Sequence, residues 1–119
     1  MNGNKNEGNG NMGIQVYHGK CTRAMDDERF GGPALNFPQD FHHVATVDVA
    51  DEDMNKVFKA TNSVDGGWWN NEGVTAHTDS PAFSGEKGTR STSIGDRIVL
   101  SDGRVFKCSP AGWEEVATA

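Results

Sequence analysis

The sequence predicts a small α+β domain, in which an antiparallel sheet of about four strands carries one helix on one face. Short runs of β-branched and apolar residues recur along the chain, one segment has helical periodicity, and an Asp-Gly pair separates two of the apolar runs. The 119 residues are enough for one domain with a modest core and too few for two.

The first twelve residues are predicted to be a disordered tail that precedes a single domain over 13–119. No large apolar side chain lies between Met1 and Met12, so ordering this segment would cost backbone entropy without burying apolar surface. It also lacks the apolar stretch of a signal peptide, and no run approaches the roughly 18 apolar residues of a membrane helix. We therefore expect a cytoplasmic protein with no membrane contact.

The first two predicted strands are 14–17 and 44–49. Apolar and polar residues alternate in the first, and β-branched residues dominate the second. Between them, 23–41 is rich in Gly, Pro and acidic residues and is predicted to be a long irregular loop. Another short strand is considered over 73–78.

The segment 52–61 is predicted to be the helix. Asp51 is placed to cap its first N–H groups, and apolar positions at i, i+3, i+4 and i+7 form one face, which holds Met54, Val57, Phe58 and Thr61. If Phe58 is buried against the sheet, Phe58→Ala should cost about 3–5 kcal/mol.

The last two predicted strands, 97–100 and 104–108, form a hairpin around Asp102-Gly103. Gly accepts the positive φ of a tight turn whose twist matches the flanking strands. A tight turn predicts two cross-strand pairs, Leu100 with Val105 and Val99 with Phe106.

Charge and cysteine content narrow the function classes. The formal net charge of −6 argues against sequence-specific or general nucleic-acid binding, which needs clustered Lys and Arg, and favours a basic partner. The two cysteines, Cys21 and Cys108, form no Cys-x-x-Cys pair, so we expect reduced thiols.

Metal binding and catalysis receive little support from the motifs. Ligands could come from the four histidines beside Asp40, Asp79 or Cys21, but no metal-site spacing is present among His18, His42, His43 and His77. A nucleophile could be built from a cysteine with any histidine, or from Ser91 or Ser93 with His77, but no catalytic motif accompanies them. We expect no metal, no cofactor and no enzyme activity.

The run Arg90-Ser91-Thr92-Ser93 admits two interpretations. One guanidinium and three hydroxyls could bind a phosphate or a carboxylate, and with His77 they would form a nucleotide or phosphate site of a binding protein or small enzyme. Alternatively, the hydroxyls satisfy backbone groups where a loop enters a strand, and Arg90 pairs with an acid. The structural interpretation is favoured.

The candidate partner-binding residues are two adjacent tryptophans, one arginine and an acidic run. In extended backbone, one ring of Trp68 and Trp69 would face outward. An exposed Trp between Gly and Asn is typical of an interface anchor and can also stack on a base, or the ring could plug a loop over the end of the helix. The acidic run could be a solvated loop, or could imitate nucleic-acid phosphates toward a basic groove. The predicted contact residues are Trp68, Trp69, Arg90, Asp26, Asp27 and Glu28.

Residues 54–116 resemble the YodL-like family. The resemblance lies in a helix Met54-Asn55-Lys56-Val57-Phe58, the run Arg90-Ser91-Thr92-Ser93-Ile94-Gly95-Asp96 leading into Ile98-Val99-Leu100, and the ending Gly112-Trp113-Glu114. Members are small domains of phages, plasmids and their bacterial hosts, often in accessory proteins with proposed counter-defence roles. The resemblance implies a context of mobile DNA and no particular reaction. We therefore expect a phage or mobile-element accessory protein in the host cytoplasm that binds a host protein, such as a component of a CRISPR or restriction system.

Overall fold

The computed structural model describes residues 13–20, 25, 28, 31, 35–49, 53–62, 67–83, 88–110 and 112–116. The predicted tail over 1–12 lies outside the described residues, as do Asp26 and Asp27 of the predicted contact set.

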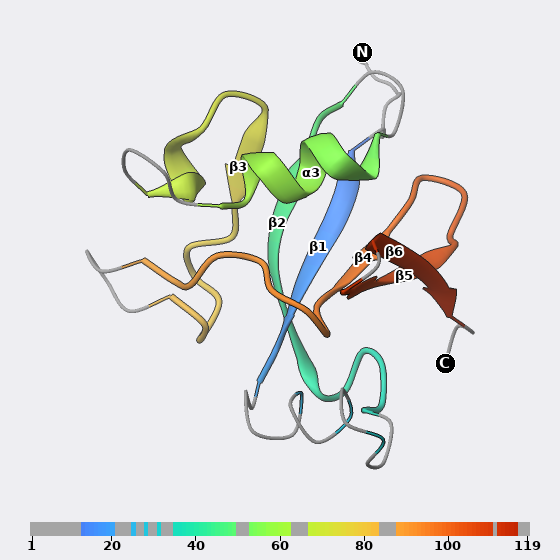
Figure 1. The fold of residues 1–119 in the computed structure, drawn as a ribbon. Helices are drawn as coiled ribbons and strands as arrows, with labels where there is room; N and C mark the ends of the chain where they lie inside the picture. Colours follow the sequence, from blue (N-terminus) through green and yellow to red (C-terminus); the bar gives the residue numbers. More distant parts are fainter. Residues whose placement is uncertain are drawn as a thin grey trace.

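The described residues form an α+β fold with one antiparallel sheet, which confirms the predicted class (Figure 1). The sheet has six strands rather than about four: β1 (Ile14–Gly19), β2 (Phe41–Val47), β3 (Val74–Ala76), β4 (Arg97–Val99), β5 (Val105–Ser109) and β6 (Gly112–Val116). Their order is β3-β2-β1-β4-β5-β6, and every neighbouring pair is antiparallel. Of the two edge strands, β6 was not predicted, and β3 lies within 73–78, where a short strand was considered but not placed in the predicted sheet.

The strand β2 contains a β-bulge and starts earlier than predicted. Val16 pairs with Ala45 and Tyr17 pairs with His43, so Val44 is an extra residue on β2. Both Val44 and Ala45 are fully buried. The strand begins at Phe41, which pairs with Gly19 at the end of β1, three residues before the predicted position.

The helix α3 (Met54–Ala60) is shorter than predicted. Its cap is Asp53, not Asp51: the Asp53 carboxylate accepts hydrogen bonds from the backbone N–H groups of Asn55 and Lys56. Val57 is fully buried, but Phe58 is 37% exposed, so the predicted burial of Phe58 is wrong. Consecutive residues of an α-helix point about 100° apart around its axis, so Val57 lies over the sheet while Phe58 lies at its margin.

The β4–β5 hairpin forms where Asp102-Gly103 predicted it, with a different register. Val99 pairs with Val105 and Ile98 with Phe106, so the predicted pairing was wrong by one residue. The turn is longer than two residues: the N–H of Gly103 donates to the Leu100 carbonyl, and Gly103 has a φ of 94°. This register places Ile98 and Phe106 on one face, where both are buried.

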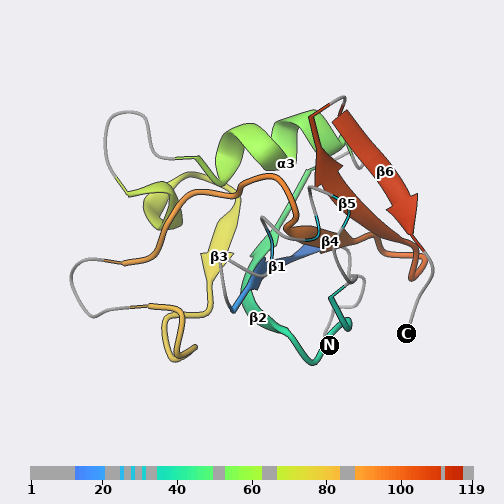
Figure 2. The ribbon, with the colours of Figure 1, turned by 60° about the horizontal axis from the view of Figure 1, so that its bottom comes forward.

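The core lies between this face of the sheet and the segments that cover it, namely α3 and the 3-10 helix η1 (Trp68–Asn70). Its buried members are Ile14, Val16, Val44, Ala45, Val47, Val57, Trp68, Ile98, Leu100 and Phe106. Figure 2 shows α3 above the sheet and β6 as its outermost strand. Beyond β6, no further strand is present among the described residues.

Candidate functional site

A buried carboxylate, Asp96, connects the loop before β4 to the end of β1. Arg90 donates from Nη1 to Oδ2 at 2.6 Å and from Nη2 to Oδ1 at 2.7 Å. The backbone N–H groups of Gly19 and Ser93 donate to Oδ1 at 3.0 Å and to Oδ2 at 2.7 Å. Asp96 has no exposed surface, so these four donors replace the water that a carboxylate needs.

Arg90 is committed to internal contacts. Besides the bidentate pair with Asp96, Nη1 donates to the Ser91 carbonyl at 3.1 Å and Nη2 to the Gly19 carbonyl at 3.4 Å. Its side chain is 29% exposed. A phosphate would have to compete with a buried carboxylate for the same planar guanidinium. The geometry therefore favours the structural interpretation of the Arg90 to Ser93 run.

His18 lies beside this pair and is almost fully buried. Its Nε2 is 2.9 Å from Thr92 Oγ1 and 3.8 Å from Asp96 Oδ2, and its ring lies 5.8 Å from that of Trp68. Burial lowers the pKa of His18 to about 4, against a smaller opposing effect of Asp96. A carboxylate, an imidazole and a hydroxyl are the groups of a catalytic triad, but here Thr92 is also buried and cannot reach a substrate.

His77, the fourth residue of the predicted ligand site, contacts a different part of the molecule. Its ring lies 4.2 Å from that of His43, and its Nε2 is 3.2 Å from Thr46 Oγ1. Ser91, Ser93 and Arg90 contact the Asp96 region instead. Among the described residues, no three His, Cys, Asp or Glu side chains are arranged to hold a metal ion.

Trp68 is fully buried, which removes it from the predicted contact surface. The two tryptophans lie in η1 and not in extended backbone, so they do not alternate between inside and outside. The Trp68 indole N–H donates to the Arg90 carbonyl at 2.8 Å. Trp69 is half-buried, and its ring is so close to Gly67 and Gly88 that a Cβ at either glycine would lie within 2.3 Å of it.

Glu28, the described member of the acidic run, is also committed to an internal pair. Its carboxylate receives Arg97 Nη2 at 2.9 Å and the Leu35 N–H at 2.8 Å. The side chains of Glu28 and Arg97 are 6% and 5% exposed. Burial tends to raise the pKa of Glu28, but the hydrogen bonds from Arg97 and Leu35 lower it overall. Glu28 itself is therefore engaged in internal contacts and is not a solvated side chain.

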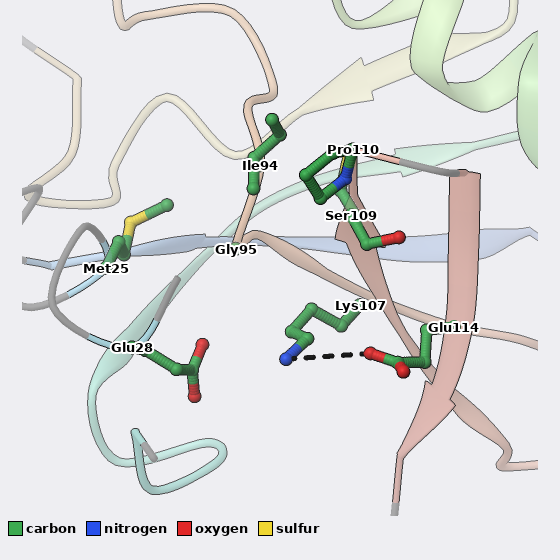
Figure 3. Close-up of a pocket in the computed structure, with 9 residues that line it drawn as sticks. Met25, Glu28, Ile94, Gly95, Lys107, Ser109, Pro110 and Glu114 are labelled. Carbon is green, nitrogen blue, oxygen red and sulfur yellow. Dashed lines mark ion pairs between the residues drawn. The ribbon is translucent and has the colours of Figure 1, made fainter. Parts of the chain in front are cut away.

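A pocket of about 200 Å³ opens between Glu28 and the β5–β6 hairpin (Figure 3). Lys107 Nζ is 3.7 Å from Glu114 Oε1 within it. Cys108 also lines the pocket, but burial raises the pKa of its thiol to about 11, so it is not a thiolate nucleophile near neutral pH.

The sequence did not predict the surface where the helix α3 meets the edge strand β6, which we call the α3–β6 edge. Phe58 packs edge-to-face against Trp113, with ring centroids 6.3 Å apart. Trp113 is half-buried, and Glu114 and Glu115 beside it are exposed. The Gly112-Trp113-Glu114 ending was visible in the sequence, but two adjacent glutamates interrupt the alternation that indicates a strand.

Comparisons with models of protein families, with curated proteins and with solved structures found no match. Within the described part of the chain, no helix has the length and apolar character needed to span a bilayer.

Proposed function

We propose that this protein is a non-enzymatic binding protein that docks on a host protein through the surface at the α3–β6 edge. This surface comprises Phe58, Trp113 and the exposed strand β6. The observation that carries the proposal is the 37% exposure of Phe58 against Trp113 at a sheet edge that no described strand covers. A rigid aromatic pair of this kind is typical of the centre of protein interfaces.

The resemblance of residues 54–116 to the YodL-like family supplies the biological context of the proposal. It supports a phage or mobile-element accessory protein whose partner is a component of host defence, of the CRISPR or restriction type. Both residues of the aromatic pair, Phe58 and Trp113, belong to the segments that carry this resemblance. The proposed site of action is the host cytoplasm.

The alternative proposal, a nucleotide or phosphate site built on Arg90, Ser91, Ser93 and His77, receives less support. The guanidinium of Arg90 forms a bidentate pair with Asp96, and His77 contacts His43 and Thr46. A phosphate site needs donors that are unpaired and directed toward one point. Here the guanidinium of Arg90 is already paired, and His77 contacts a different part of the molecule from Arg90, Ser91 and Ser93.

Affinity capture from a bacterial host lysate tests the proposal. Wild type, Phe58→Ala and Asn55→Ala serve as baits, because Asn55 is an exposed α3 residue whose truncation leaves the aromatic pair intact. We expect a stoichiometric protein on the wild-type and Asn55→Ala baits and its loss on Phe58→Ala. Retention by all three baits, or a co-purifying small molecule that absorbs ultraviolet light with no protein, would contradict the proposal.

A further inference from the structure

Among the described residues, β6 is the last strand of the sheet at one edge. In an antiparallel ladder, alternate N–H and C=O groups point toward each side of the strand, and β5 occupies one side of β6. Among the described residues no strand occupies the other side. Five residues from Gly112 to Val116 are about as long as an average strand. Such an edge can take a strand from another chain through backbone hydrogen bonds.

The side chains along this edge specify what the added strand should carry. Trp113 pairs with Cys108 and Glu115 with Phe106, so both lie on the face that carries the core. Glu114 pairs with Lys107 and lies on the opposite face. An added strand would therefore place one residue beside Trp113 and Phe58, and the next two residues beside Glu114 and Glu115.

Both glutamates have charge available for a partner. Glu114 is 62% exposed, and its contact with Lys107 is long, at 3.7 Å. Within the described part of the chain, Glu115 is exposed and has no ion pair. Opposite charges that face each other across two strands stabilise the pairing, and like charges oppose it.

We infer that β6 takes an extended partner segment in which an apolar residue is followed or preceded by two basic residues. The apolar residue contacts Trp113 and Phe58, and the Lys or Arg side chains pair with Glu114 and Glu115. A second copy of this chain is disfavoured in the pairing registers that place Glu114 or Glu115 opposite a carboxylate of the other copy, because like charges that face each other across two strands oppose pairing. The inference rests on the proposed docking function and specifies its partner.

A random peptide library displayed on phage tests this inference. The library is selected on the wild-type protein, and enriched peptides are then measured on two variants. Glu114→Gln/Glu115→Gln removes both charges at the edge. Glu72→Gln removes one charge from an exposed residue just before β3, at the opposite edge of the sheet.

We expect enriched peptides to contain an apolar residue next to two Lys or Arg residues and to lack Pro, which cannot complete a ladder. Their affinity should fall about tenfold on the double variant, fall with added salt, and stay unchanged on Glu72→Gln. Peptides that are acidic, rich in Pro or insensitive to the double variant would overturn the inference, as would no enrichment.

A protein captured from the lysate distinguishes a failure of this inference from a failure of the docking function. If a captured protein requires Phe58 but binds wild type and the Glu114→Gln/Glu115→Gln variant equally, the docking function stands and the basic strand is overturned. If capture does not require Phe58, the docking function itself fails.

Discussion

At the scale of single residues, Asp96 determines how the polar side chains of this protein are used. It is the acceptor for Arg90 and for two backbone N–H groups, and His18 and Thr92 pack beside it. Asp96, His18 and Thr92 carry the chemical groups of a catalytic triad, but here they connect the end of β1 to the start of β4. An ion pair buried in this way costs most when one partner is removed.

Arg90→Ala is expected to destabilise the fold by about 3 kcal/mol, because it leaves the Asp96 carboxylate buried without its cation. Arg104→Ala is the matched control: its pair with Asp102 is formed by side chains that are 50% and 51% exposed, and such pairs contribute little. Chemical denaturation of both variants measures the difference. Equal stability of the Arg90→Ala variant and wild type would contradict the structural role of Arg90.

Because His18 is buried in the folded protein, we expect the free energy of unfolding to fall in mild acid. Its pKa is about 4 in the folded protein and 6.5 in the unfolded reference, so the unfolded chain binds the proton first as the pH falls. The stability is complete above about pH 6.5 and declines toward pH 4, by at most about 3 kcal/mol from this group. The pKa values of His42 and His43 are also lowered by burial and act in the same direction.

Denaturation curves of wild type and His18→Gln between pH 7.5 and pH 4 isolate the contribution of His18, because the other titrating groups are common to both proteins. The free energy of unfolding of the variant should change less steeply with pH. Parallel pH profiles would show that His18 is not the group responsible.

At the scale of elements, local signals could predict the helix, the central hairpin and a short strand where β3 lies, but they could not predict the edge strand β6. Helical periodicity and the Asp-Gly turn act within a few residues. The β4–β5 register depends on a turn that continues to Arg104. The strand β6 owes its position to pairing with β5 and not to its own alternation, and the bulge in β2 likewise depends on its neighbours.

The different burial of the neighbouring helix residues Val57 and Phe58 predicts different losses of stability when each is replaced by Ala. Val57 is fully buried and Phe58 is 37% exposed. Val57→Ala should therefore cost about 2–3 kcal/mol, and Phe58→Ala less than about 1.5 kcal/mol, below the 3–5 kcal/mol expected from sequence alone. Thermal and urea unfolding of both variants measure the order. A larger loss for Phe58→Ala would restore the prediction from sequence and contradict this packing of α3.

At the scale of the whole molecule, the sheet presents two different edges. The β3 edge lies near η1, which holds the half-buried Trp69, and the β6 edge carries Phe58, Trp113 and two glutamates. Sequence reasoning chose the tryptophan pair, because large rings between Gly and Asn indicate an anchor. The fold instead uses Trp68 as a core residue. Which aromatic side chains stay exposed depends on tertiary packing, which local sequence does not reveal.

The most direct test compares these two edges. The affinity of a host protein captured by wild type is measured by titration calorimetry for wild type, Phe58→Ala and Trp69→Ala, after each variant is shown to be folded by circular dichroism. We expect Phe58→Ala to weaken binding at least about tenfold, as loss of an interface anchor does, and Trp69→Ala to bind like wild type. Unchanged binding by Phe58→Ala, together with loss by Trp69→Ala, would contradict docking at the α3–β6 edge.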